Sequence, residues 1–151
     1  MAEATHQAPW TMPAVVPSLA VRDPEATLEW FGHLGFQPGT VVRSPDGTIM
    51  HADLVRGDAC VMIGPVMDCE PGSSGMGVYV NLRGESVDAF YEQIKDRVEV
   101  VQPPETMFWG DRLLQVRHPD GYKFWFSEHV RDVPEAELAQ IVAQWAAQQP
   151  A

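Results

Sequence analysis

Apolar positions in the first half of the chain predict one helix among several strands. Asp23 and Pro24 are typical of a helix N-cap followed by proline at the first helical position. Leu28, Phe31 and Leu34 then form an apolar stripe at helical spacing. Around this helix, alternating or continuous apolar runs bounded by turn residues predict strands over residues 15–21, 36–42, 49–55 and 59–63.

The second half of the chain repeats this order at an offset of about 60 residues. A second apolar stripe predicts a helix at Val87, Phe90, Tyr91 and Ile94. Strands are expected over 77–82, 98–101, 112–118 and 122–127, with Pro103-Pro104 ending the second of these. Solenoid repeats are shorter and occur at least three times. The pattern therefore predicts an α+β protein of two βαβββ modules whose curved half-sheets pack around one cavity.

Segments outside the two modules divide the rest of the chain. We expect an N-terminal tail (1–13), a first module (14–64), a linker rich in Gly, Pro and Ser (65–75), a second module (76–130) and a C-terminal helix (131–151). Asp132, Pro134 and Glu135 predict a capping box at the start of that helix. Its apolar stripe is Leu138, Ile141, Val142 and Trp145. The stripe docks either on its own domain or on a partner, including a second copy of the chain.

Composition narrows the classes of partner. The 151 residues suit one compact domain or two halves that share a core. A net charge of −11 disfavours nucleic acid, which needs clustered Lys and Arg, and is compatible with cationic ligands. No apolar run reaches the roughly 18–20 residues of a membrane span, and the N-terminus lacks the features of a secretory signal. Two cysteines, Cys60 and Cys69, make no disulfide framework, so we expect a reduced, cytoplasmic protein.

Four stretches of the chain resemble a known family. Residues 19–38, 49–64, 87–94 and the block WGDRLLQVRHPDGYKFWF (109–126) are similar to the glyoxalase/bleomycin-resistance/extradiol-dioxygenase superfamily, also called vicinal oxygen chelate proteins. The resemblance implies paired βαβββ modules, an open U-shaped mixed sheet around a cavity, and a homodimer. It leaves function open, because this fold serves both metalloenzymes and metal-free drug binders.

The resemblance also implies where a metal would sit. Enzymes of the family take one ligand from the first strand and one from the last strand of each module, as two His and two carboxylate-type groups. Here the first strands (15–19 and 77–81) contain no His, and four residues after each turn glycine stand Val61 and Trp125. We therefore predict no metal and no other cofactor. The alternative is a displaced site for Zn, Ni, Fe or Mn among His51, Asp53, His118, Glu128 and His129.

Strand parity predicts which side chains line the cavity. The expected ligand-binding residues are Asp53, Met62, Tyr79, Trp109, Arg112, Gln115 and Trp125. Aromatic walls with a few polar groups suit a planar or amphipathic organic compound. Alternatives stay open, since Trp125 can belong to the core and Arg112 can form an ion pair with Asp111 or Glu105.

His51 is the expected catalytic residue if the protein is an enzyme, because a carboxylate two residues on shares its strand face. That carboxylate, Asp53, is expected roughly 6.6 Å away along the strand, which is far for a hydrogen bond. Two functions result. The first is a metal-free protein that sequesters an aromatic compound, including a cationic one. The second is a glyoxalase-like lyase or dioxygenase with a non-standard metal site, or a metal-free isomerase that uses His51 as base.

Overall fold

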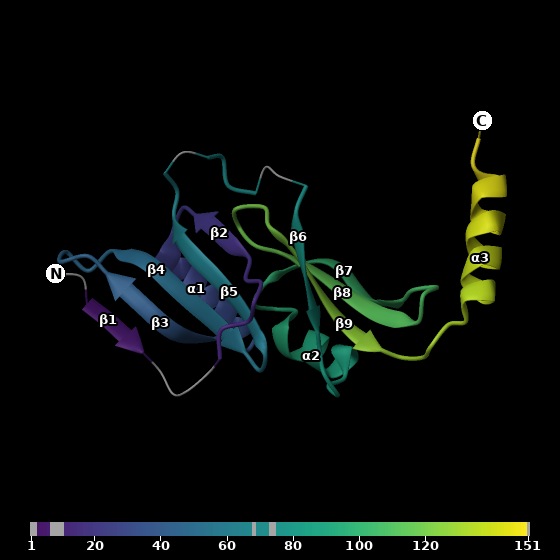
Figure 1. Cartoon of the computed structure of the whole chain (residues 1–151), viewed down its shortest axis with the longest axis horizontal. Helices are drawn as coiled ribbons and strands as arrows, with labels where there is room; N and C mark the ends of the chain where they lie inside the picture. Colours follow the sequence, from purple (N-terminus) through teal and green to yellow (C-terminus); the bar gives the residue numbers. More distant parts are fainter. Residues whose placement is uncertain (1–2, 7–10, 68, 73–74, 151) are drawn as a thin grey trace.

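The computed structural model describes residues 3–6, 11–67, 69–72 and 75–150 and contains two mixed β-sheets, each with a helix on one face (Figure 1). The first module holds β2 (Ser18–Val21), α1 (Pro24–His33), β3 (Gln37–Arg43), β4 (Ile49–Arg56) and β5 (Ala59–Pro65). The second holds β6 (Gly77–Asn81), α2 (Val87–Ile94), β7 (Glu99–Thr106), β8 (Asp111–Arg117) and β9 (Lys123–His129). The predicted α+β fold is confirmed, as are its two βαβββ modules and the C-terminal helix α3 (Glu135–Gln148).

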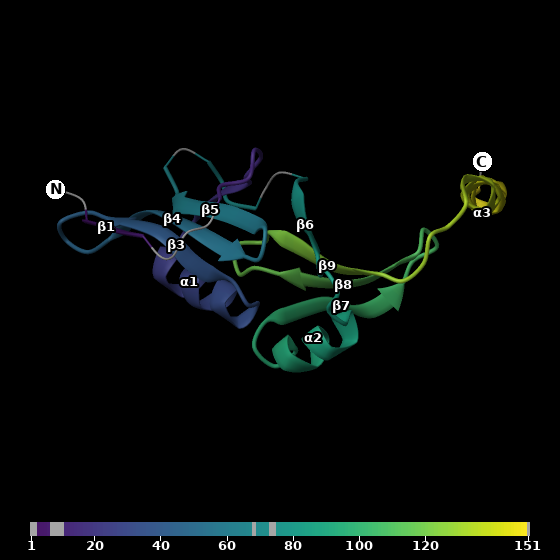
Figure 2. The same cartoon turned by 60° about the horizontal axis from the view of Figure 1, so that its bottom comes forward.

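Each module builds its sheet in the same way. The first and last strands run parallel in the pairs β2–β5 and β6–β9, and the other pairs are antiparallel. The strand orders are β1-β3-β4-β5-β2 and β6-β9-β8-β7. Helices α1 and α2 lie on the same side of the molecule, so both sheets turn their uncovered faces to the other side (Figure 2). We call these the open faces.

Local sequence explains both helix starts. The Asp23 carboxylate accepts a hydrogen bond from the Ala26 N–H at 3.0 Å, and the Ser86 hydroxyl accepts one from the Ala89 N–H at 3.2 Å. The predicted Asp23 N-cap is therefore confirmed. Gly35 adopts a positive φ of 86° directly after α1, which suits a residue without a Cβ.

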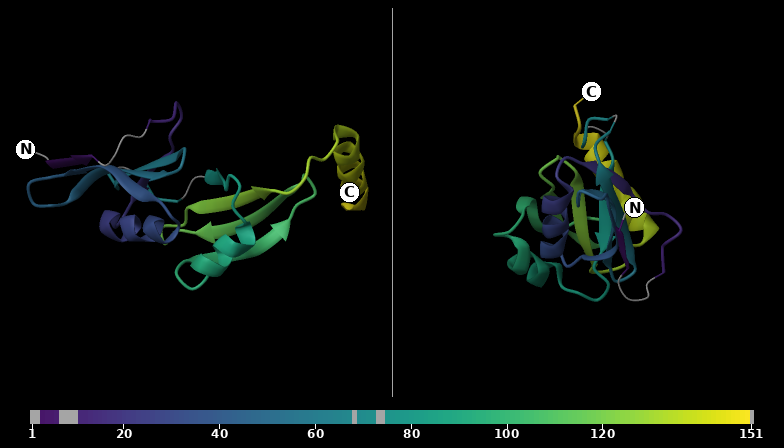
Figure 3. Two further views of the ribbon diagram at one scale, coloured as in Figure 1. Left: turned by 90° about the horizontal axis from the view of Figure 1, so that it is seen from below. Right: turned by 90° about the vertical axis from the view of Figure 1, so that its left-hand side faces the viewer.

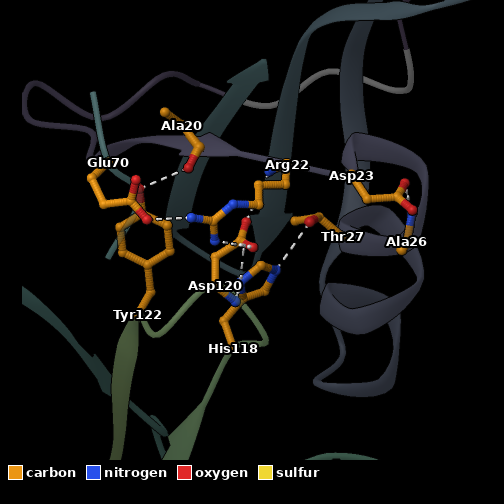
Figure 4. Close-up of polar contacts among 9 residues, drawn as sticks. All are labelled: Ala20, Arg22, Asp23, Ala26, Thr27, Glu70, His118, Asp120 and Tyr122. Atoms are coloured by element: carbon orange, nitrogen blue, oxygen red, sulfur yellow. Dashed lines mark hydrogen bonds and ion pairs between the residues drawn. The ribbon is translucent and has the colours of Figure 1, made fainter. Parts of the chain in front are cut away.

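A single apolar core joins the two modules. The Phe124 ring of β9 lies 5.3 Å from the Trp30 ring and 5.5 Å from the Phe31 ring of α1, measured between centroids. Polar contacts cross the same junction (Figure 4). The Tyr122 hydroxyl donates to the Ala20 carbonyl at 2.7 Å, and the His118 and Thr27 side chains are 3.0 Å apart. The junction therefore fixes one module against the other.

The structure differs from the sequence prediction at the N-terminus. Residues 1–13 were expected to be a loose tail, but Glu3–His6 form strand β1, which pairs antiparallel with β3. The rest of that segment is described only from residue 11. The added strand makes the first sheet five-stranded.

Two expected element boundaries are also wrong. Pro103 and Pro104 do not end a strand, because β7 continues to Thr106. This strand lies at the edge of its sheet and pairs irregularly between Val100 and Glu105, so missing N–H groups are tolerated there. The capping box at Asp132 is absent too: α3 begins after Pro134 without a side-chain cap. No helix among the described residues is long and apolar enough to span a membrane.

Candidate functional site

The open face of the second sheet carries three of the predicted site residues in one row. Tyr79, Trp125 and Gln115 lie opposite one another on β6, β9 and β8. Their neighbours along the strands, such as Phe124, Phe126 and Leu114, are fully buried on the helix-covered face. Tyr79 is 45% exposed. The prediction that these three side chains share one surface therefore agrees with the strand register.

Asp111 organises the polar groups of this face. Its carboxylate accepts hydrogen bonds from the Tyr79 hydroxyl at 3.0 Å, the Trp109 indole N–H at 3.1 Å and His129 Nδ1 at 2.9 Å. Three donors from β6, the turn before β8 and the end of β9 thus converge on one acceptor. The Asp111 carboxylate thereby orients two aromatic rings and one imidazole.

The hydrogen bonds of Tyr79 have a defined direction. Its oxygen lies 3.0 Å from Asp111 Oδ2 and 2.9 Å from Ser127 Oγ, and it has one proton to donate. Since an ionised carboxylate only accepts, Tyr79 donates to Asp111 and accepts from the buried Ser127 hydroxyl. Burial raises the pKa of the Tyr79 phenol, and the nearby Asp111 carboxylate raises it further. Tyr79 therefore stays a neutral donor at ordinary pH.

His129 connects this network to the segment that leads to α3. Its second ring nitrogen, Nε2, is 2.8 Å from an Asp132 carboxylate oxygen. Both nitrogens can donate only in the imidazolium form. Hydrogen bonds to Asp111 and Asp132 accordingly raise the pKa of His129.

The indole of Trp125 packs against Gly77 of β6. A Cβ added to Gly77 would lie 2.1 Å from Trp125 Cζ3, so the indole would have to move to admit a side chain there. The six-membered ring of Trp125 therefore lies against Gly77 of β6, two residues before Tyr79. This packing holds a large aromatic surface on the open face.

The open face of the first sheet carries the other predicted pair. The imidazole of His51 is 2.9 Å from a carboxylate oxygen of Asp53, so the expectation that they are too far apart is wrong. Side chains at i and i+2 lean toward each other enough to close the gap. Met62 lies opposite Asp53 on the neighbouring strand. Asp53 is buried, whereas His51 is partly exposed.

The Cys60 thiol shows no sign of reactivity. Burial raises the pKa of the Cys60 thiol to about 11, and the charge of Asp53 adds to the rise. A thiol with this pKa is almost wholly protonated at neutral pH and makes a poor nucleophile. Cys60 lies against the Met12 sulfur, with the two sulfurs 4.0 Å apart. Packing is the role that the structure supports for Cys60.

Arg112 does not line the open face, contrary to expectation. Its guanidinium faces α2 and forms two hydrogen bonds with the Asp88 carboxylate, at 2.8 and 2.9 Å. Gln115 is three residues away on the same strand, so the two side chains must point to opposite faces. The expected ion-pair partners, Asp111 and Glu105, are not the ones used. Because Gln115 lies on the open face, the alternation of side chains along β8 places Arg112 on the other face.

Sequence reasoning missed the centre of the network. Asp111 was considered only as a partner of Arg112, and Ser127 was not singled out. Parity gives the signal that could have found them: Asp111 lies four residues before Gln115, and Ser127 lies two residues after Trp125. Both therefore belong on the face that holds Tyr79.

The family's metal positions do not fit a divalent cation in this chain. Val61, expected at the ligand position of the first module, is buried on the face toward α1, and the open-face residue is Met62, opposite Ser18. In the second module the corresponding pair is Tyr79 and Trp125. Thioether and indole groups do not hold a hard cation, and single neutral hydroxyls are poor replacements for the carboxylate and imidazole ligands of the family. Among residues that the structure describes, no three His, Cys, Asp or Glu side chains are grouped to hold a metal.

A hollow of about 380 Å³ adjoins the network beyond the ends of β6 and β9. Ser127 and His129 line it together with Asn81 and the segment that leads from β6 to α2. Its volume falls within the range that small-molecule sites occupy. The open face and this hollow together form the candidate binding site.

Comparisons with known proteins agree with this architecture. The crystal structure of TioX from Micromonospora is 29% identical with a TM-score of 0.63, covering 79% of this chain and all of TioX. A bleomycin-binding protein solved with bleomycin has the same fold at 22% identity and a TM-score of 0.59, covering 78% of this chain and 98% of that one. An uncharacterized protein of Mycobacterium tuberculosis is 28% identical over 141 residues, or 83% of this chain and 80% of that protein.

A family model matches residues 11–126, which include both modules but stop before α3. The match spans well over half of the chain and agrees with the fold. This chain therefore belongs to the Glyoxalase/Bleomycin resistance protein/Dioxygenase superfamily.

Proposed function

We propose that this protein binds and sequesters a planar aromatic compound that carries positive charge, and that the ligand lies on the open face of the second sheet. One observation carries the proposal: the Asp111 carboxylate bonds both the Tyr79 hydroxyl and the Trp109 indole, and Trp125 lies opposite Tyr79 on the neighbouring strand. Rings held in place before binding lose little entropy when a ligand stacks on them. The site supplies flat apolar surface and polar anchoring together, as sites for amphipathic ligands do.

Charge supports a cationic ligand. Aromatic faces attract cations through their quadrupole, and indole does so most strongly. Asp111 and Glu105 both lie on the open face, by the register of β8 with β7. The whole chain carries a net charge of −11, which draws cations toward its surface.

The likeness to a protein solved with bleomycin is a likeness of fold, and it makes bleomycin a reasonable first compound to test. The absence of fitting ligands at the family's metal positions favours binding without a metal. We further propose that the protein is a homodimer, as the sequence resemblance implies, and that it is cytoplasmic, as the two cysteines indicate. A second chain placed over the open face would give the ligand its opposite wall.

Isothermal titration calorimetry tests the proposal with bleomycin and a panel of planar cationic dyes, each paired with a neutral analogue. We expect Trp125→Ala to weaken binding at least tenfold, or about 1.4 kcal/mol, because the stacking surface is lost. Tyr79→Phe removes the hydroxyl that bonds Asp111 and should weaken binding several-fold. Tyr91→Phe is the matched control, since Tyr91 lies on α2, away from the open face. Equal affinity of Trp125→Ala and wild type would show that the ligand binds elsewhere.

The pair His51–Asp53 favours one second candidate, a metal-free enzyme with His51 as general base. A buried carboxylate at 2.9 Å orients the imidazole, which is what such a base needs. Incubation with each compound that binds, followed by mass spectrometry, should then reveal a chemical change that disappears in both His51→Ala and Asp53→Asn. If wild-type protein leaves every compound chemically unchanged, the metal-free enzyme is ruled out.

A glyoxalase-like or dioxygenase reaction at a displaced metal predicts retention of the ion. Dialysis against Zn, Ni, Fe and Mn, with excess then removed, should leave no stoichiometric metal if the binding proposal holds. One ion per chain would favour the metalloenzyme instead.

A further inference from the structure

Helix α3 stands apart from the modules at the end of the molecule opposite β1 (Figures 1 and 3). It has 14 residues, none of them buried, and Trp145 is 62% exposed. A helix of this length is marginally stable in water without packing. Its apolar stripe, defined above as Leu138, Ile141, Val142 and Trp145, therefore needs a covering surface.

An apolar groove lies beside this stripe. Phe108, Ile141, Val142 and Trp145 line a hollow of about 340 Å³. Phe108 is 48% exposed, and its ring stacks edge to face on Trp109 at 5.0 Å. Exposed apolar side chains gathered in this way mark an interaction surface.

We propose that a second copy of this chain covers the stripe, with the two α3 helices antiparallel about a two-fold axis between Ile141 and Val142. The apolar stripe is self-complementary when one helix is turned end to end against the other. Under that axis Leu138 lies opposite Trp145, and Ile141 lies opposite Val142. A two-fold contact requires this kind of self-complementary surface.

The position of the charged residues favours an antiparallel arrangement of the two α3 helices. The acidic residues Glu135 and Glu137 lie in the first turn of α3, and residues 138–148 carry no charge. Parallel helices would place these carboxylates side by side, whereas antiparallel helices separate them. The dipoles of antiparallel helices also oppose each other favourably.

Charge also disfavours a basic foreign peptide as the occupant. Such a partner would need acidic groups along the stripe, but Glu137 already bonds the Arg131 guanidinium at 2.8 Å. The stripe itself offers only apolar contact. An identical uncharged surface is therefore the better match.

This contact is separate from the body of the superfamily, because the family match ends at residue 126 and α3 begins at Glu135. Two helices about 21 Å long make a short contact, whereas stable interfaces bury roughly 1,200–2,000 Å². We therefore expect association through α3 to depend on protein concentration.

Sedimentation equilibrium over a roughly hundredfold range of protein concentration tests the proposal. The full-length double variant Val142→Gln/Trp145→Gln places two polar side chains on the stripe, and glutamine keeps helix propensity high. Ala143→Gln/Ala147→Gln is the matched control, with the same residues added to the opposite side of α3. Wild type and control should show a rise in mass with concentration. The stripe variant should lose that association step, with a dissociation constant at least about tenfold higher.

Three results would overturn the proposal: a wild-type mass that does not rise with concentration, a stripe variant that associates like wild type, or equal loss in stripe variant and control. Far-UV circular dichroism of each variant shows whether the modules stay folded. Ligand affinity, measured separately, tests the proposed function and not this contact. If the two modules also dimerise without α3, that association step should remain in every variant.

Discussion

At the scale of single residues, Gly77 shows how a small side chain positions a large one. The Trp125 indole occupies the space where a Cβ would be, so the glycine places an aromatic ring on the open face. The backbone itself needs no glycine here, because Gly77 is not among the residues with positive φ. The constraint is therefore steric and comes from another strand.

Replacing Gly77 by alanine should displace this indole. We expect Gly77→Ala to change the near-UV circular dichroism spectrum and to weaken ligand binding at least about tenfold, as loss of one stacking contact would. Gly75→Ala is the control, since an added Cβ there meets nothing within 4 Å. An unchanged spectrum in Gly77→Ala would mean that the indole does not pack against Gly77.

His118 is a buried base at the junction of the modules (Figure 4). Its Nδ1 accepts the Asp120 N–H at 3.0 Å, so Nε2 carries the proton that Thr27 Oγ1 accepts. Burial lowers the pKa of His118 below 6.5, although the Asp120 carboxylate acts in the opposite direction. Protonation would also remove the acceptor for the Asp120 N–H.

Stability should consequently fall as the pH drops. With a pKa lower in the folded than in the unfolded protein, the unfolded chain binds the proton first, so the free energy of unfolding decreases from about pH 7 through 6.5 and below. Urea denaturation at several pH values should show a shallower dependence in His118→Gln than in wild type. The partly exposed His33 supplies the control, His33→Gln. Identical slopes in His118→Gln and wild type would contradict this role.

At the scale of elements, the β8 strand performs two tasks on its two faces. Asp111 and Gln115 face the binding surface, whereas Arg112 holds the first turn of α2 through Asp88. This bidentate pair lowers the pKa of the Asp88 carboxyl and raises that of Arg112. A helix is thereby fixed to the sheet that carries the site.

Arg112→Ala should therefore lower stability and leave ligand affinity unchanged. Because both side chains are partly exposed to solvent, we expect a loss of only about 0.5–1 kcal/mol in the free energy of unfolding. Urea denaturation and calorimetry on the same sample separate the two effects. Arg97→Ala, which removes an exposed charge just after α2, should cost less. If Arg112→Ala lost ligand binding but kept its stability, Arg112 would instead contact the ligand.

At the scale of the whole molecule, the shared core makes the two modules one folding unit. Trp30 and Phe31 of α1 contact Phe124 of β9, so neither module buries its apolar surface alone. The Arg22 guanidinium adds ion pairs with Asp120 and Glu70 across the same junction. Unfolding of one module should then expose the core of the other.

Phe124→Ala should lower the free energy of unfolding by about 3–5 kcal/mol, because the ring is fully buried. Wild type and variant should each unfold in one transition, coincident by far-UV circular dichroism and by tryptophan fluorescence. The exposed Met67 supplies a control, Met67→Ala, with little effect expected. Two separated transitions would show that the modules fold independently.

The amino-acid sequence determined the local elements and their repetition. Caps such as Asp23 and apolar stripes such as Val87, Phe90 and Ile94 act over a few residues, so their signal is complete in the chain itself. Strand parity likewise placed Tyr79, Gln115 and Trp125 on one face. The predicted strand ends were wrong where the neighbouring strands determine the outcome. At Pro103 and Pro104 the strand continues because β7 lies at the edge of its sheet, where proline is tolerated.

Only the tertiary structure decided which side chains meet. Asp111 joins Tyr79, Trp109 and His129 because β6, β8 and β9 lie side by side. Spacing along a strand gives the face on which Asp111 lies, but not which side chains converge on it. Arg112 pairs with Asp88 for the same reason, 24 residues away. Hydrogen bonds and ion pairs act over about 3 Å in space whatever the separation in sequence. Local pattern therefore predicts the elements, and their packing determines the site.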